Sequence, residues 1–126
     1  MEYQISSKQG VRIRLLLSDC EGEALAVESV ASIKYTIYEK YLGAWSPVAG
    51  HTNVAVATSS VFYPPVEDEH SEQDYNFSHT ISMQSAYPFP ERGRTYVVEY
   101  EFRDVNGEAF IPTEADGSPM FVFTTY

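Results

Sequence analysis

The sequence is poor in cysteine, because Cys20 is the only one among 126 residues. A single cysteine cannot close a disulfide within the chain, and secreted β-domains of this size often contain one. The first ten residues, MEYQISSKQG, also lack the basic and then apolar layout of a secretory signal peptide. We therefore expect the chain to assemble in a reducing cytoplasm.

Basic residues are scarce as well. Eight lysines and arginines stand against eighteen aspartates and glutamates, which gives a net charge of −10 at pH 7. A field of this sign repels nucleic acid and anionic membranes. No apolar run approaches the ~20 residues of a membrane span. We expect neither nucleic acid nor a membrane as the partner.

The motifs of common catalytic and metal sites are also missing. The sequence has no Gly-x-Ser-x-Gly, no phosphate-binding glycine loop and no dinucleotide fingerprint. His51, His70 and His79 are far apart and have none of the usual spacings of metal ligands. The acidic run at 67–74 has no glycine for a calcium loop, and Cys20 lies between two carboxylates that disfavour a thiolate. We expect a non-catalytic protein without a metal or a cofactor.

What the chain does contain is a hydrophobic and aromatic content typical of a folded β-protein. Hydrophobic residues make up 44% of the sequence, and ten tyrosines and seven phenylalanines contribute most of the aromatic side chains. Such residues favour strands and contact surfaces. A chain of this length buries a core without disulfides, so we expect a single domain over residues 1–126.

Strand patterns recur along the chain with turn signals between them. In RGRTYVVEYEFRDVNGEAF, residues 92–110, apolar side chains alternate with polar ones from Tyr96 onward, and Asn106-Gly107 favours a type I′ hairpin turn. Seven to nine short strands of this kind, without a sustained helical period, predict an all-β sandwich. The predicted core consists of Ile13, Leu15, Leu17, Ile33, Tyr35, Ile37, Tyr96, Val98, Tyr100, Phe102, Phe121 and Phe123.

The same alternation assigns side chains to the outside of the sheets. Seven basic residues fall almost wholly on outward faces or in loops next to the strands, and with Glu99 and Glu101 they are expected to form cross-strand ion pairs on a wet face: Arg12, Arg14, Lys34, Lys40, Arg92, Arg94 and Arg103. Ala31 is expected inside with Ile33. In DYNFSHTISM, residues 74–83, His79 falls on the apolar face as a hydrogen-bonded or interface histidine, while Asn76 falls on the opposite face.

Two motifs resemble immunoglobulin-like modules. PERGRTYVV, residues 90–98, resembles the turn into strand F of such a sandwich, with a tyrosine corner at Tyr96 and Val98 at the core position that holds cysteine in antibody domains. DCEGEAL and DVNGEAF resemble the Asp-x-x-Gly-Glu hairpins of bacterial and phage immunoglobulin-like modules. The resemblance implies a single immunoglobulin-like β-sandwich of about seven to nine mostly antiparallel strands.

A small, acidic β-domain of this kind is similar to accessory structural proteins of tailed bacteriophages, and the stretch 75–104 carries most of this similarity. The resemblance implies a virion protein that assembles in the bacterial host cytoplasm and decorates or cements the head. Its partners would be other virion proteins, above all the major capsid protein, or further copies of the chain. A neck, tail or baseplate adaptor and a carbohydrate-binding or adhesion module are the alternatives.

Aromatic residues near turns are the candidates for contact with such a partner. Tyr38, Tyr41 and Trp45 lie close together in the sequence and are able to form an aromatic patch for a protein or a sugar ring. Packing of Trp45 into the core, or over an edge of the sandwich, is the competing interpretation. Tyr87 and Phe89 lie in a loop that prolines hold extended, where both core packing and partner docking are open.

Overall fold

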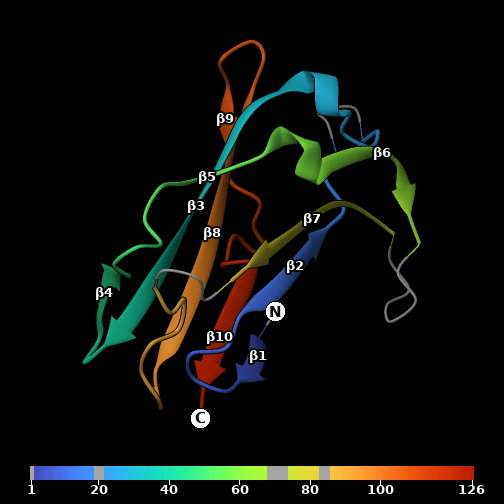
Figure 1. Ribbon diagram of the computed structural model, residues 1–126. Helices are drawn as coiled ribbons and strands as arrows, with labels where there is room; N and C mark the ends of the chain where they lie inside the picture. Colours follow the sequence, from blue (N-terminus) through green and yellow to red (C-terminus); the bar gives the residue numbers. More distant parts are fainter. Residues whose placement is uncertain (1, 19–21, 68–73, 83–85) are drawn as a thin grey trace.

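Two stacked β-sheets form the protein (Figure 1). The computed structural model describes residues 2–18, 22–67, 74–82 and 86–126. The larger sheet has the order β1 (Glu2–Ile5), β10 (Phe121–Thr125), β8 (Thr95–Asp104), β3 (Val30–Tyr41) and β4 (Ala44–Pro47), with β5 (Val54–Val56) also on β3 and β9 (Ala109–Phe110) also on β8. The smaller sheet has the order β2 (Val11–Leu15), β7 (Tyr75–Ile81) and β6 (Val61–Val66).

The predicted all-β sandwich is therefore confirmed. Within the described residues, neighbouring strands pair antiparallel except β1, which lies parallel to β10. The strand number of this part of the chain is ten, above the expected seven to nine, because short pieces such as Ala109–Phe110 pair as strands of their own. The remaining regular structure there consists of two 3₁₀ turns, Val27–Ser29 and Thr58–Ser60. The immunoglobulin-like identity stays a prediction.

The core lies between the sheets, and all twelve residues expected there are buried. Its centre is aromatic. The ring of Phe77 on β7 meets Tyr100 and Phe102 on β8 edge to face, with centroid distances of 5.1 and 5.2 Å. Such pairs add about 0.5–1.5 kcal/mol to the free energy gained by burial alone. Alternation works as a guide here because successive side chains of a strand point to opposite faces, and only one of these faces meets the other sheet.

On the wet face of the larger sheet, one expected cross-strand ion pair forms, between Lys34 on β3 and Glu101 on β8, and a second ion pair forms within β8. Lys34 Nζ lies 3.6 Å from Glu101 Oε1, and Arg103 Nη2 lies 3.5 Å from the same oxygen. The side chains are partly exposed, so each pair contributes less than about 1 kcal/mol. Their main effect is to keep this face polar.

Alternation gives the wrong side for two residues. Ala31 is exposed, because the register between β3 and β8 shifts between Val30 and Ser32 and Val30 is buried instead. Asn76 is fully buried, since the chain around Leu17 and Leu25 folds over it. Its Oδ1 accepts a hydrogen bond from the backbone N–H of Leu17 at 2.7 Å, and its Nδ2 donates to the carbonyl oxygens of Leu17 and Leu25.

The hairpin between β8 and β9 forms, but without the predicted type I′ turn. Gly107 has a φ of 88°, whereas Asn106 is not among the residues with positive φ. The N–H of Gly107 donates to the carbonyl of Asp104, and the Asp104 carboxylate accepts from the N–H groups of Asn106 and Glu108. This aspartate holds Asn106 in the ordinary half of φ space, which gives a longer loop with one left-handed glycine.

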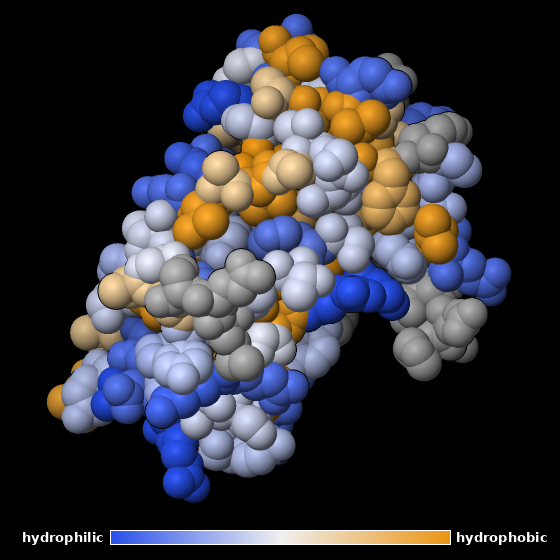
Figure 2. Space-filling view, viewed as in Figure 1, coloured by the Kyte–Doolittle hydropathy of each residue, from blue (hydrophilic) through white to orange (hydrophobic). Residues whose placement is uncertain are grey.

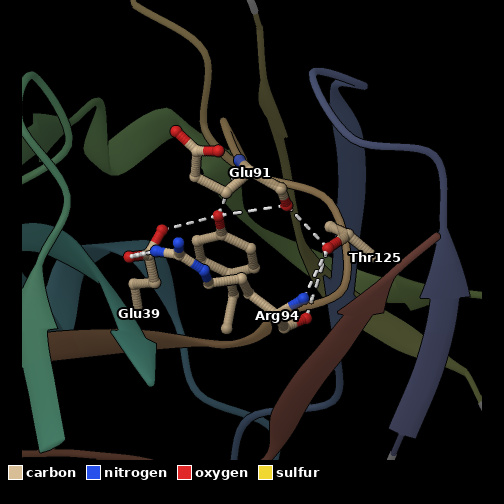
Figure 3. Close-up of polar contacts among 5 residues, drawn as sticks. Glu39, Glu91, Arg94 and Thr125 are labelled. Carbon is tan, nitrogen blue, oxygen red and sulfur yellow. Dashed lines mark hydrogen bonds and ion pairs between the residues drawn. The ribbon is translucent and has the colours of Figure 1, made fainter. Parts of the chain in front are cut away.

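Tyr96 makes the contact that a tyrosine corner requires, and it adds a second one (Figure 3). Its hydroxyl accepts a hydrogen bond from the N–H of Glu91 at 2.9 Å and donates to Glu39 Oε2 at 2.7 Å. Arg94 Nη1 binds the other oxygen of Glu39 at 2.8 Å. Thr125 Oγ1 donates to the carbonyl of Glu91, so the network ties β3, the turn before β8 and the end of β10 together.

A second polar group lies inside the sandwich. His79 on β7 contacts the Tyr100 hydroxyl through Nδ1 at 2.9 Å, as expected for a hydrogen-bonded histidine. Tyr35 reaches His51 Nδ1 with its hydroxyl at 2.8 Å, and its ring lies 5.3 Å from the ring of His79. Burial lowers the pKa of His79 and raises the pKa values of Tyr35 and Tyr100, because it penalises the charged forms.

We predict that Tyr96→Phe lowers the free energy of unfolding by about 1.5–3 kcal/mol, the range for hydrogen bonds to charged groups. The substitution removes the hydroxyl that joins Glu39 to the Glu91 backbone. Urea denaturation followed by circular dichroism measures the change. Tyr126→Phe, at an exposed position, is the control and should change stability by less than about 0.5 kcal/mol. Equal effects of the two substitutions would refute the role of the network.

We also predict that acid weakens the fold through His79. Its pKa is lowered in the folded state relative to the ordinary value of 6.5, so the unfolded chain takes up the proton first. The contribution of neutral His79 is complete above pH ~6.5 and is lost as the pH falls towards the folded pKa. The free energy of unfolding of the wild type should therefore fall relative to His79→Gln below pH 6.5. Parallel pH curves for the two proteins would contradict this.

Candidate functional site

The end of the β3–β4 hairpin exposes three large apolar side chains. Tyr41 is 51% exposed, Leu42 88% and Trp45 47%. We call residues 41–45 the hairpin tip. In Figure 1 it reaches the lower left extremity of the molecule, away from the stacked part of the sheets. In the space-filling view, hydrophobic side chains form separate patches between polar ones (Figure 2). The tip is thus an exposed apolar feature on an otherwise mixed surface.

The turn of this hairpin is the type I′ turn that was expected elsewhere. Tyr41 pairs with Ala44, so Leu42 and Gly43 alone make the connection. Both have positive φ, 51° and 80°, as a type I′ turn demands. Glycine adopts this conformation without cost, but for leucine the left-handed region costs about 1–2 kcal/mol. The protein therefore holds an exposed leucine where asparagine or glycine would be more stable.

The pairing of β3 with β4 decides which way each aromatic ring points. Trp45 lies opposite Lys40, and Tyr38 lies opposite Pro47, so these four side chains share the outer face of the sheet. Tyr41 directly follows Lys40 in β3, so its side chain points to the opposite face of the sheet. The three aromatic residues expected as one patch are thus divided. Tyr38 is also only partly exposed, so the tip displays Trp45 on one face, Tyr41 on the other and Leu42 at the end.

Charged side chains hold the two exposed rings. The guanidinium carbon of Arg94 lies 3.7 Å from the centre of the Tyr41 ring, and Arg94 is itself fixed by its ion pair with Glu39 at 2.8 Å. Lys40 Nζ lies 5.7 Å from the centre of the Trp45 ring. Such cation–π contacts contribute about 0.5–1 kcal/mol at exposed positions. Because Arg94 belongs to the Tyr96 network, the tip is anchored to the core.

The other pair of candidate contact residues behaves differently. Phe89 is 0% exposed and packs on Tyr96 and Phe123 at centroid distances of 5.3 and 5.0 Å. It is a core residue, so its proposed role in partner binding is wrong. Its loop folds inward because the carbonyl of Phe89 accepts a hydrogen bond from the Lys8 N–H. Tyr87 is exposed, with Lys8 Nζ 5.3 Å from its ring centre.

A shallow hollow of about 260 Å³ lies beside the hairpin, between the end of β4 and the turn before β8. Glu39, Glu91 and Arg94 supply its charges, and Pro47 and Pro90 form part of its wall. The carboxylate of Glu39 is already bound by Arg94 and by the Tyr96 hydroxyl. Burial and this carboxylate raise the pKa of Tyr96, which therefore remains a hydrogen-bond donor. The hollow is thus part of the anchor of the tip.

The described residues contain no cluster of three or more His, Cys, Asp and Glu side chains able to hold a metal ion. His51 binds the Tyr35 hydroxyl and the carbonyl of Ala86. Cys20, His70 and most of the acidic run lie outside the described residues. In the described part of the chain, no helix has the length and apolar character needed to cross a membrane.

Comparisons of the chain with protein-family models, with curated proteins and with solved structures give no match. The candidate site is therefore defined by its geometry. Sequence reasoning found Tyr41 and Trp45 but missed Leu42. The available signal was Gly43, which marks a turn in a stretch bounded by tyrosine and tryptophan, but nothing in it indicates that Leu42 shares the turn conformation.

We predict that Leu42→Asn raises the free energy of unfolding by about 0.5–1 kcal/mol, because asparagine tolerates the left-handed conformation. Urea denaturation measures the change. Leu42→Ala removes the same exposed side chain but keeps the unfavourable φ, so it is the matched control and should leave stability nearly unchanged. Equal stabilisation by both variants would show that the turn stores no strain.

Proposed function

We propose that the chain is a non-catalytic structural protein of a tailed-phage virion, which binds the outer surface of the major capsid protein lattice through the hairpin tip. The observation that supports binding most directly is the exposed Leu42, held in a left-handed conformation between exposed Tyr41 and Trp45. Backbone strain at an exposed apolar residue costs stability, and such strain concentrates at functional positions. The virion setting is carried over from the resemblance of the sequence stretch 75–104 to accessory phage proteins, together with the negative net charge.

The geometry of the tip suits insertion between protein surfaces. Its apolar side chains point to both faces of a narrow ribbon and to its end, so a groove between coat subunits would cover all three. Full burial of each large apolar side chain contributes about 1.5–3 kcal/mol. Tryptophan and tyrosine are the residues that dominate such contacts. Arg94 already fixes the Tyr41 ring in the unbound protein, so less side-chain conformational entropy is lost when a partner binds.

The charge of the chain fits the exterior of a phage head. A net charge of −10 opposes contact with packaged DNA but keeps an outer protein soluble. On the wet face of the larger sheet, Lys34, Glu101 and Arg103 form a polar surface that discourages further sheet stacking. A protein bound at subunit junctions through its tip would add buried area between the coat subunits and oppose internal pressure. A neck, tail or baseplate position would use the same tip.

A carbohydrate-binding or adhesion module is the second candidate, and the half-exposed Trp45 ring is the observation that favours it. A sugar stacks on one flat ring face. Here Lys40 lies near the ring of Trp45, and Tyr41 points to the opposite side of the hairpin. The tip offers one ring to a sugar but three side chains to a protein, so the protein partner is preferred.

We predict that the double variant Leu42→Ala/Trp45→Ala loses at least about tenfold in affinity for heads assembled from the major capsid protein of the same phage, about 1.4 kcal/mol. Co-sedimentation of purified protein with these heads measures binding. Val105→Ala/Ile111→Ala removes exposed apolar side chains at the β8–β9 hairpin, which lies at the other end of β3 from the tip, and is the matched control. Equal binding of both double variants would refute the role of the tip.

Heads that carry the wild-type chain should also withstand higher temperature than heads without it, as differential scanning calorimetry would show. If the chain binds the heads but does not raise the temperature that they withstand, the chain attaches to the head without cementing it, and the cement role is refuted. If neither heads nor tails bind, and a glycan array gives a signal that disappears in Trp45→Ala, the carbohydrate module replaces the virion proposal.

A further inference from the structure

A groove of about 880 Å³ lies between the two sheets on the edge of the sandwich opposite the hairpin tip. Its rims are β1 and β2, which belong to different sheets. Apolar side chains of both sheets line it, among them Ile5, Ile13, Leu15, Phe121 and Phe123. The groove exists because β1 leaves β2 and pairs with β10 in the other sheet, so no described strand closes the sandwich here.

Both rims are edge strands. In the described part of the chain, β1 pairs only with β10, and β2 pairs only with β7. An edge strand presents a row of backbone N–H and C=O groups on the side that has no neighbour, and this row is a template for a further strand. A small ligand would leave the row without partners, whereas an extended peptide would pair with it. The groove therefore fits a strand in shape and in hydrogen bonding.

The side chains of β2 define what such a strand must carry. Ile13 and Leu15 point into the sandwich, and Arg12 and Arg14 alternate with them on the outer face. Arg12 Nε donates to Thr80 Oγ1 at 3.3 Å, and the guanidinium carbon of Arg14 lies 4.7 Å from the centre of the Tyr75 ring. Both guanidinium groups are thus held along the outer face.

A strand added beside β2 would place its own side chains opposite these residues. Its inward side chains would meet the apolar groove, and its outward side chains would lie next to Arg12 and Arg14. Opposite charges in directly facing positions are favourable by about 0.2–1 kcal/mol each, and like charges are unfavourable. The complementary strand therefore alternates apolar residues with aspartate or glutamate. Asp74 lines the groove as well, so an acidic side chain of the added strand would be repelled if it lay next to this carboxylate.

The same charges argue against a second copy of the chain. Antiparallel pairing of two β2 strands across a two-fold axis would set the arginines of one copy beside those of the other. Each copy also carries a net charge of −10, which opposes association of two whole molecules more than association with a short segment. Self-pairing through β2 is thus disfavoured.

We propose that the groove between β1 and β2 binds an extended segment of a partner protein, which adds as a strand to the edge of β2 and alternates apolar with acidic side chains. The proposal does not depend on the virion role, because this edge and the hairpin tip are separate surfaces. It makes the chain a protein with two attachment points, the hairpin tip at the β4 edge of the larger sheet and the β2 edge of the smaller sheet.

The test uses an acetylated and amidated peptide of about seven residues, the length of an ordinary strand, in which valine alternates with glutamate. Nuclear magnetic resonance titration of the full chain in 0.15 M salt measures binding. At this salt concentration the net charge is screened over about 8 Å, but charges in contact still interact. We expect saturable shifts of the backbone amides of Val11–Leu15 and slower hydrogen exchange at this edge. The same peptide with lysine in place of glutamate should bind at least about tenfold more weakly.

Arg12→Glu/Arg14→Glu should reverse this preference, so that the lysine peptide binds better than the glutamate peptide. Arg92→Glu/Arg103→Glu changes the net charge equally at exposed positions elsewhere and should keep the wild-type preference. If the reversed variant does not fold, Arg12→Gln/Arg14→Gln should remove the preference instead. The hairpin-tip variant Leu42→Ala/Trp45→Ala should bind the glutamate peptide as the wild type does.

Three results would overturn the proposal. The first is no saturable binding of either peptide up to about 1 mM, the limit of weak specific association. The second is binding that ignores the sign of the peptide charge or shifts amides at β4 or β9 instead of β2. The third is a dimer in sedimentation analysis whose contact buries β2, because the second copy would then be the occupant.

Discussion

The contact of Phe77 with Tyr100 and Phe102 joins the two sheets, and the rest of the structure depends on it. These rings come from the centres of β7 and β8, the middle strands of their layers. The apolar faces of the two sheets pack against each other here. The outer strands lie at the edges of the sheets, where part of their surface is not covered by the core. The β3–β4 hairpin emerges at one edge, and the groove between β1 and β2 opens at the other.

The core reaches the hairpin tip through polar contacts. Tyr96 is buried among aromatic residues, but its hydroxyl binds Glu39, whose other oxygen binds Arg94, and Arg94 covers the ring of Tyr41. Three successive contacts thus lead from the interior to an exposed aromatic side chain. A buried hydroxyl and a partly buried carboxylate are costly unless they are paired. The same pairing therefore stabilises the fold and fixes the tip.

Much of the fold could be predicted from the sequence, because half-buried strands require alternating apolar residues, and the twelve residues of the predicted core are all buried. The exceptions have local causes. A register shift turns Ala31 outward, and Asp104 bonds the backbone of Asn106 and so excludes the type I′ turn. Asn76 and Phe89 are covered by segments that fold back from distant positions, which no local pattern reveals. Leu42 could not be expected in a left-handed conformation, because that conformation disfavours leucine and pairing of the strands imposes it.

Packing between the sheets is the central claim, and nuclear Overhauser contacts between aromatic side chains in solution test it most directly. The account predicts contacts from the ring of Phe77 to the rings of both Tyr100 and Phe102, whose centres lie 5.1 and 5.2 Å away. These residues are more than twenty positions apart in the sequence, so only stacked sheets bring them together. Contacts confined to sequence neighbours, with Phe77 exposed to solvent, would contradict the sandwich and both surfaces derived from it.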